Sequence, residues 1–256
     1  MSTLYNAPIT CSSCGESVHV EIADSLNANR MPAARERVLA RELFTTDCAC
    51  GRRITAIHSV LYVDFERGLW VQVAPEEERI RYPELEGGVL SAYREAFDPA
   101  TYPMAVAALG AMVRPRLAFG YEELREKVVA ADAGIDDALL EVLKLELLVA
   151  RPDLLTDGVE LMVLTAVDDQ LLRLDLHSFA GGEGQVIGEL GVARAGYESV
   201  VARRAEVVAI YPGLFERPYV NIARYRFAPE AALDSEAPIE GTPGAPLAGT
   251  VEAAEV

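Results

Sequence analysis

The sequence lacks the long apolar run and the basic surplus that would place the protein in a membrane or on a nucleic acid. Its longest apolar stretch, MAVAALGAMV at 104–113, is far shorter than the roughly 20 residues that a membrane-spanning helix needs. The 256 residues include 23 basic and 40 acidic side chains, a formal charge of −17. General nucleic-acid binders have a basic surplus, and an anionic membrane repels an acidic protein. The first segment, MSTLYNAPIT, has no features of a secretory signal, so we expect a soluble cytoplasmic protein.

Recognisable catalytic machinery is also scarce. Histidine occurs three times, and the motifs G-x-S-x-G, G-x-x-x-x-G-K-[ST] and H-E-x-x-H are missing. The glycine-rich GGEG at 181–184 has no lysine after it and lies between two strand-like runs, so we interpret it as a hairpin turn. We therefore predict no catalytic residues and favour a protein without catalysis of its own.

What the sequence does contain is a group of four cysteines within its first 50 residues: Cys11, Cys14, Cys48 and Cys50. They form a C-x-x-C motif in CSSCGES (11–17) and a C-x-C motif in TTDCACGRR (45–53). In a reducing compartment, clustered cysteines favour metal binding or catalysis over a structural disulfide. Zinc prefers four soft ligands in a tetrahedron, and each pair here is followed by a glycine and by β-propensity, as in a zinc ribbon. The sequence therefore predicts one structural Zn2+ ion held by these four cysteines.

The second cysteine motif is one residue shorter than the first. If it is aligned on its last cysteine, Cys50, the partner in a full C-x-x-C would fall at position 47, where the chain has Asp47. Either a residue is missing and Cys48 still reaches the metal, or Asp47 binds through a carboxylate oxygen, which zinc accepts. We favour Cys48, because thiolate is the better ligand in a structural site, and keep Asp47 as the reserve ligand. His19 and His58 are further reserves that we interpret as ordinary strand residues.

Composition and pattern divide the chain into three regions. Residues 1–83 alternate short β-patterns with one helical stretch, and residues 84–228 begin with helical patterns before β-patterns return. Residues 229–256 hold six acids, no base and seven prolines or glycines, and cannot bury enough apolar surface to offset their ordering entropy. We expect this last region to be disordered and the first two to pack together. The predicted fold class is α+β: a zinc-ribbon-like N-terminal β region with an inserted helix, then helices and a second small antiparallel sheet.

Periodicity predicts the individual elements. Helices are expected at 31–44, 84–97, 102–113, 121–134, 135–155 and 195–209. Strands are expected at 17–23, 52–65, 68–75, 159–167, 170–179, 185–193 and 219–227. The strands at 52–65 and 68–75 are separated by ERG and should form a hairpin, with Trp70 in the core.

The cysteine order and spacing resemble those of the CpXC-domain proteins, a bacterial and archaeal family named for two Cys-Pro-x-Cys-like motifs. The similarity runs from CSSCGESVHVEIA through DCACGRRITAIHSVLYVDF to VQVAP, within residues 11–75. The run YEELREKVVAADAGIDDALLEVLKLEL is similar to the part that follows in longer members, so the resemblance covers about 9–150 and, more loosely, extends to about 228. It implies a cysteine-bound metal and no particular activity. Arginine outnumbers the two lysines, as is typical of GC-rich bacterial genomes, and we expect a bacterial protein.

Two alternative functions stay open. Zinc ribbons often contact DNA or RNA, but residues 1–83 hold nine arginines against eleven acids and lack the clustered positive charge that phosphate binding needs. We interpret the arginines at 35–41 as a solvated helix face shared with glutamates. The second alternative is a thiol-based redox sensor in which Cys11 and Cys14 become linked. Redox C-x-x-C motifs usually open a helix, whereas GESVHVEI leads into a strand, which disfavours this alternative.

The favoured function is a partner-binding or regulatory module. Hairpins and a zinc ribbon expose strand edges that can pair with other strands. The apolar helix at 135–149 packs either into the internal core, which we favour, or onto another subunit. We therefore predict a protein partner or self-association, and neither a nucleic acid nor a membrane.

Overall fold

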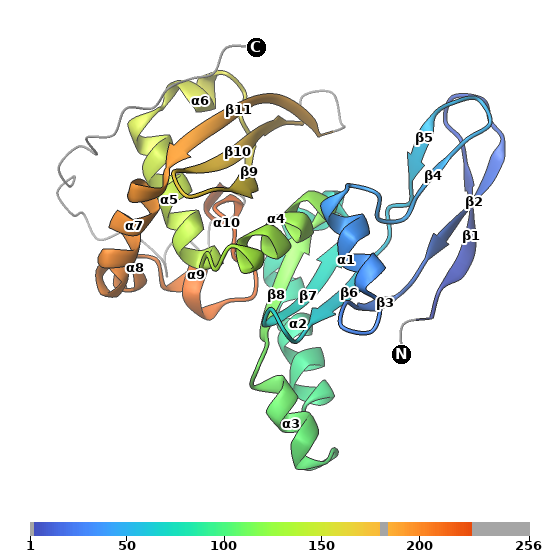
Figure 1. Ribbon diagram of the computed structural model, residues 1–256, viewed down its shortest axis with the longest axis horizontal. Coiled ribbons are helices and arrows are strands. Elements are labelled where there is room, and N and C mark those ends of the chain that lie inside the picture. Colours follow the sequence, from blue (N-terminus) through green and yellow to red (C-terminus); the bar gives the residue numbers. More distant parts are fainter. Residues whose placement is uncertain (1–2, 180–183, 227–256) are drawn as a thin grey trace. The chain divides into compact units, whose positions relative to one another are not determined.

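The computed structural model describes residues 3–179 and 184–226 (Figure 1). The chain forms two compact units, Met1–Val128 and Val129–Val256. The boundary that the sequence suggests near residue 84 falls inside the first unit, where helix α2 (Tyr82–Ala96) follows a 3-10 helix (Glu76–Arg81). The acidic tail predicted at 229–256 and most of the GGEG turn lie outside the described residues.

Two short hairpins form the N-terminal part of the first unit. Strand β1 (Tyr5–Thr10) pairs antiparallel with β2 (Ser17–Ile22), and β4 (Thr45–Asp47) pairs antiparallel with β5 (Arg53–Thr55). The strand predicted at 17–23 is confirmed as β2. The second hairpin has only three residue pairs, so it has little backbone hydrogen bonding of its own.

Helix α1 (Pro32–Leu39) lies in the chain between the two hairpins. It has proline in its first turn, as expected, and buries Ala34 and Val38. The helix ends five residues before the predicted limit at 44. Arg41 and Phe44 adopt positive φ angles of 58° and 51°, which a right-handed helix does not allow.

A four-stranded mixed sheet follows, in the order β3-β6-β7-β8. Its strands are β3 (Ser25–Asn27), β6 (Val60–Asp64), β7 (Leu69–Ala74) and β8 (Arg114–Phe119). The predicted hairpin is confirmed as β6 and β7, and Trp70 is 3% exposed. The run predicted as one strand at 52–65 is divided, because its first part forms β5 in another sheet. Strand β8 was not predicted, and its Pro115 has no amide hydrogen to donate to a neighbouring strand. A proline is tolerated there because β8 is at the sheet edge.

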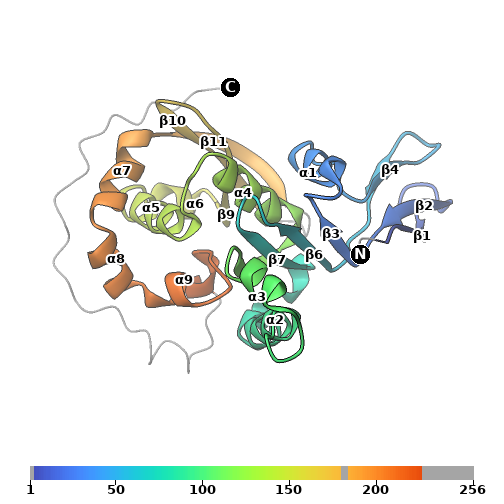
Figure 2. The same cartoon turned by 60° about the horizontal axis from the view of Figure 1, so that its bottom comes forward.

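Helix α2 packs against β8, and α3 (Met104–Gly110) lies beside α2 (Figure 2). The hydroxyl of Tyr93 on α2 donates a hydrogen bond to the carbonyl of Gly110 at 2.7 Å. A Cβ atom at Gly110 would come within 2.6 Å of the Phe97 ring, so only glycine lets the backbone of α3 lie this close to Phe97. Helix α4 (Gly120–Asp132) begins in the first unit and ends in the second.

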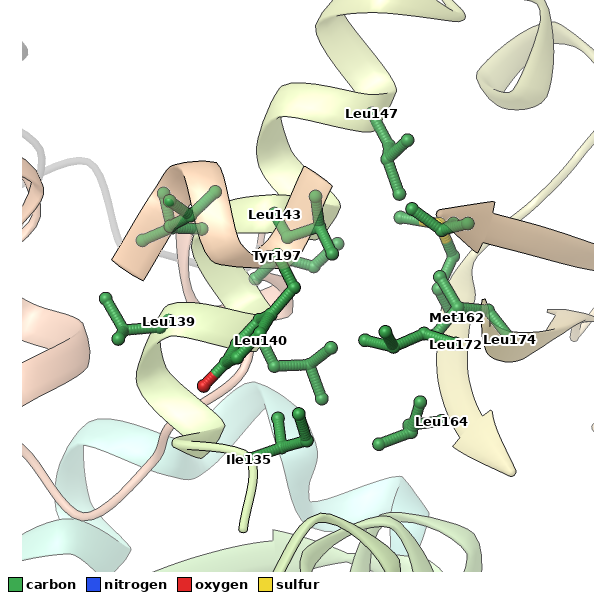
Figure 3. Close-up of a cluster of buried hydrophobic side chains, with 14 of the residues drawn as sticks. Ile135, Leu139, Leu140, Leu143, Leu147, Met162, Leu164, Leu172, Leu174 and Tyr197 are labelled. Atoms are coloured by element: carbon green, nitrogen blue, oxygen red, sulfur yellow. The ribbon is translucent and has the colours of Figure 1, made fainter. Parts of the chain in front are cut away.

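The second unit is built on helix α5 (Asp137–Ala150) and an antiparallel sheet in the order β11-β10-β9. The strands are β9 (Leu161–Val167), β10 (Leu171–Ser178) and β11 (Gln185–Ala193), which confirms the second antiparallel sheet expected from the sequence. Figure 3 shows the core between them, in which leucines of α5 face apolar side chains of the sheet. The helix predicted at 135–155 is thus mainly α5, which ends at Ala150 and packs into the internal core, as favoured from the sequence. The labelled core residues include Leu139, Leu140, Leu143, Met162, Leu164 and Leu172.

Short helices complete the second unit: α6 (Asp153–Thr156), α7 (Arg194–Ala202), α8 (Arg204–Ile210), α9 (Pro212–Glu216) and α10 (Ala223–Arg226). The strand predicted at 219–227 is wrong, because its described part contains α10. The Asn221 side chain accepts a hydrogen bond from the Ala223 amide at 2.8 Å and thereby starts this helix. Within residues 3–179 and 184–226, no helix is long and apolar enough to cross a lipid bilayer.

Candidate metal centre

Each cysteine pair lies in the turn of a two-stranded hairpin. The first cysteine turn (residues 11–16) joins β1 to β2, and the second cysteine turn (residues 48–52) joins β4 to β5. The two hairpins lie side by side in Figures 1 and 2, and β2 packs against β4. This packing brings together cysteines that are more than 30 residues apart in the chain.

Two backbone hydrogen bonds close the first cysteine turn. The Cys11 amide donates to the Glu16 carbonyl at 2.8 Å, and the Gly15 amide donates to the Cys11 carbonyl at 2.9 Å. Gly15 has a φ of +78°, in the left-handed region that glycine adopts without steric cost. The glycine after the C-x-x-C motif therefore lets the chain turn back into β2.

The second cysteine turn is one residue shorter but has an equivalent pair of hydrogen bonds. The Cys48 amide donates to the Arg52 carbonyl at 2.9 Å, and the Gly51 amide donates to the Cys48 carbonyl at 2.8 Å. Gly51 has a φ of +84°, which corresponds to that of Gly15 in the first turn. Cys48 therefore makes the same two backbone hydrogen bonds in the second turn that Cys11 makes in the first.

The sulfur atoms of Cys11, Cys14, Cys48 and Cys50 all lie within 4.8 Å of one another. The Cys11 and Cys50 sulfurs are 3.7 Å apart, and those of Cys14 and Cys48 are 3.5 Å apart. Four sulfurs at the zinc–sulfur distance of about 2.3 Å from one tetrahedral ion would be separated by about 3.8 Å. The cysteines are free thiols rather than disulfides, and their grouping could hold a metal ion.

The reserve ligands proposed from the sequence lie outside this group. Asp47 is the last residue of β4; its side chain is 72% exposed and its Oδ1 lies 3.6 Å from Nε of Arg53. His19 is exposed on β2, and Nε2 of His58 lies 3.0 Å from Oδ1 of Asp24. Among the described residues, the group that can hold a metal consists of the four cysteines and includes neither Asp47 nor a histidine.

The pKa values of the two thiols in the first turn are shifted in opposite directions. The amides of Ser13 and then Cys14 donate hydrogen bonds to the Cys11 sulfur and lower its pKa to about 6. For Cys14, the Glu16 amide acts to lower the pKa, but the hydrogen bond with Cys48 and the partial shielding of the sulfur from water outweigh it and raise the pKa to about 12. At neutral pH the Cys14 thiol therefore holds a proton that a bound metal ion would displace, whereas the Cys11 thiol gives up its proton more readily.

A side-chain contact also links the two turns. Nη1 of Arg52 donates a hydrogen bond to Oγ of Ser13 at 3.2 Å. Sequence reasoning missed this contact, because the two residues are 39 positions apart and neither stands out in its own turn. The two turns are thus also linked by a hydrogen bond that does not involve the cysteines.

Three arginines near the site, Arg37, Arg41 and Arg53, are paired with acidic side chains. Arg37 lies 3.5 Å from Glu21, and Arg41 lies 2.8 Å from Glu122. Arg53 lies 3.5 Å from Glu42. These pairs reduce the positive charge that the three arginines would offer to a phosphate backbone.

The family comparison agrees with this arrangement. The family model described as CpXC protein matches residues 9–144, more than half of the chain. The chain belongs to the CpXC protein family. No curated protein and no solved structure matches the chain significantly. The CpXC match includes both cysteine turns and the four-stranded sheet, and it ends within α5.

Proposed function

We propose that the four cysteines hold one zinc ion with a structural role in a zinc-ribbon-like pair of hairpins. The observation that carries this proposal is the distance of 3.5–3.7 Å between sulfurs of opposite turns, close to that of a tetrahedral zinc–thiolate site. Four thiolates also match the soft ligand set that zinc prefers. A site closed by four protein ligands leaves no position for a substrate, so the metal adds folding free energy instead of chemistry.

The second hairpin explains why the fold needs a metal at this place. It has three residue pairs, and an isolated two-stranded hairpin is marginally stable at best in water. Metal bonds from Cys48 and Cys50 to the same ion as Cys11 and Cys14 would join this hairpin to the longer one. Loss of the ion should therefore loosen residues 45–55 before the rest of the first unit.

The test is the metal content of untagged protein, measured by inductively coupled plasma mass spectrometry. We expect one zinc per chain in the native protein and in Asp47→Ala, and loss of zinc in Cys48→Ala. Asp47→Ala is the matched control, because Asp47 is adjacent in sequence and its side chain is exposed. Native protein without metal, or loss of zinc only in Asp47→Ala, would overturn the assignment.

We further propose that the protein is a binding module whose partner is a second copy of the chain, bound through residues 99–113. This segment, PATYPMAVAALGAMV, has no charged side chain, although a quarter of the chain is charged. Met104 and Met112 are 76% and 57% exposed, and large exposed apolar patches mark interaction surfaces. Because each copy has a charge of −17, two copies repel each other least where their surfaces are uncharged.

Light scattering coupled to size-exclusion chromatography tests this second proposal. We expect the native chain to be a dimer and the double variant Met104→Glu/Met112→Glu to be a monomer. Val149→Glu is the control, because Val149 is an exposed apolar residue on α5, outside the segment, and its variant should stay dimeric. A native chain that is monomeric at every concentration measured would contradict self-association.

A further inference from the structure

The two closest sulfur pairs each connect one cysteine turn to the other. Each pair joins an exposed cysteine of one turn to a buried cysteine of the other. Exposed Cys14 lies 3.5 Å from buried Cys48, and exposed Cys50 lies 3.7 Å from buried Cys11. A reagent arriving from solvent therefore meets one sulfur of each pair, with the second sulfur in contact behind it.

Pairing within a turn is less favourable for the second motif. Cys48 and Cys50 are separated by one residue, and a disulfide between them would close a very small ring. A disulfide needs a dihedral angle near 90° about its S–S bond, so this ring would strain the hydrogen bonds that close the turn. A disulfide between Cys11 and Cys14 would then leave the other two thiols without a disulfide partner, whereas pairing between turns uses all four.

We propose that peroxide oxidises the site to two disulfides between the turns, Cys14–Cys48 and Cys11–Cys50, and releases the metal. The proposal rests on the proposed function in that zinc occupies the reduced site. The same four cysteines thus have a reduced, zinc-bound state and an oxidised state with two disulfides between the turns. This connectivity differs from the Cys11–Cys14 link that the sequence suggested for a redox sensor.

The chemistry balances with hydrogen peroxide as the oxidant. The exposed Cys14 sulfur attacks one peroxide oxygen, the O–O bond breaks, and hydroxide leaves and takes a proton to form water. The Cys48 sulfur then attacks the resulting sulfenic acid, the S–S bond forms, and the sulfenic oxygen leaves as a second water. Cys50 and Cys11 react in the same way. Four thiolates, two peroxides and four protons thus give two disulfides and four waters, and Zn2+ leaves because it has lost its thiolate ligands.

The oxidised state would keep the hairpins joined. The two disulfides connect positions 34 and 39 residues apart, and they link the same two turns that the metal links. The first unit should therefore stay folded after oxidation. Removal of the metal by a chelator, in contrast, leaves the turns without a covalent or metal link and should loosen the second hairpin.

Disulfide mapping of the full native chain tests whether the disulfides join the two turns. The chain is treated with hydrogen peroxide, remaining thiols are blocked with N-ethylmaleimide, and the protein is digested with trypsin without reduction. Cleavage after arginine places Cys11 and Cys14 in peptide 1–30, and Cys48 and Cys50 in peptide 42–52. We expect these two peptides to be linked, with four hydrogens lost, and to separate on reduction. Zinc released during oxidation is measured in parallel with a chromogenic chelator.

Unlinked peptides, with the disulfide inside peptide 1–30, would overturn the proposal, as would thiols that stay reduced while zinc is retained. Two double variants sharpen the test. Cys11→Ser/Cys50→Ser keeps the Cys14–Cys48 pair, and Cys48→Ser/Cys50→Ser keeps the two cysteines of the first turn. We expect a disulfide to form at least tenfold faster in the first variant; faster formation in the second would contradict us. Circular dichroism shows whether each variant is folded, and the mapping of the native chain does not depend on them.

The results for zinc and for the disulfides separate the two proposals. Zinc in the native chain together with a disulfide inside peptide 1–30 would support the structural metal site and refute the connectivity between turns. A native chain without zinc that forms the linked peptides would refute the metal site and support the connectivity.

Discussion

Arg52 donates a hydrogen bond from Nη1 to Oγ of Ser13 at 3.2 Å, and this contact joins the two cysteine turns without a sulfur atom. Ser13 lies between Cys11 and Cys14, so the contact acts next to the candidate metal ligands. Groups that orient metal ligands without binding the metal influence its affinity. Substitution of Arg52 therefore measures how much a residue that does not bind the metal contributes to the affinity for zinc.

The first prediction concerns Arg52→Ala. An exposed hydrogen bond contributes modestly, so we expect the affinity for zinc to fall about two- to fivefold while one zinc per chain is retained. Competition with a chromogenic zinc chelator measures the affinity. Arg30→Ala is the control, because Arg30 is exposed and lies away from both cysteine turns. A complete loss of zinc in Arg52→Ala, or an equal effect of Arg30→Ala, would show that the contact does not act as described.

The second prediction concerns the glycines that end the C-x-x-C and C-x-C motifs. A Cβ atom at Gly15 or Gly51 would meet open space, so the cost of alanine is the left-handed backbone, about 1–2 kcal/mol per site. We expect each alanine variant to weaken zinc binding about tenfold, as measured by chelator competition. Gly87→Ala is a matched control, because Gly87 also has open space around it but lies inside α2 without a positive φ. That variant should leave zinc binding unchanged and stabilise the helix slightly.

The cysteine turns could be predicted because their signals are local. The spacing of the cysteines, the glycine after each pair and the β-pattern of residues 17–23 all lie within a few residues of one another. Cys48 was preferred over Asp47 because thiolate is the better ligand in a structural site. The structure places the Cys48 sulfur in the group and the Asp47 side chain in solvent. The identity of the metal and the ligand roles of the cysteines stay predictions.

The features that were not predicted depend on distant partners. Strand β8 contains Pro115 and has a weak β-pattern, and it forms because β7, more than 40 residues earlier, offers a free edge. Helix α10 replaces a predicted strand because Asn221 caps it and because Glu141, 81 residues away, accepts a hydrogen bond from the Ile222 amide at 2.8 Å. Periodicity in a short window cannot detect either partner.

The third prediction concerns the dependence of stability on pH. Burial, together with the negative charges of Glu123 and Glu122, raises the pKa of Glu76 above its ordinary value, and Arg79 offsets this only in part. A carboxyl group with a raised pKa favours the folded state at low pH, and this contribution is lost as the pH rises through the folded pKa. Glutamine stays neutral at every pH, so the Glu76→Gln variant does not lose folding stability as the pH rises. We therefore expect the variant to be more stable than the native protein at pH 7, with a difference that shrinks toward pH 4.

Urea unfolding of both proteins across this pH range measures the difference, and comparison at each pH cancels effects of metal release that the two share. Glu77→Gln is the control, because Glu77 is the next residue, is exposed, and contributes less to the raised pKa of Glu76 than burial, Glu123 or Glu122. It should follow the native curve. A Glu76→Gln variant that is less stable than the native protein at pH 7 would show that attraction to Arg79 outweighs burial.

The last prediction concerns a buried ion pair in the second unit. Nζ of Lys144 lies 2.6 Å from Oε1 of Glu141, and both side chains are fully buried on α5. Removal of one partner leaves an uncompensated charge in the core, which costs about 3–5 kcal/mol, so we expect Lys144→Met to lower the free energy of unfolding by that amount. Replacement of both charges, in Glu141→Gln/Lys144→Met, should recover much of this loss, because glutamine can still accept the hydrogen bond from the Ile222 amide. Urea unfolding measures both variants, and Arg151→Met, which breaks the exposed pair with Asp153, is the control that should change stability little. If the double variant is less stable than Lys144→Met, the pair is not what compensates the buried charge, and other partners of Glu141 must do so.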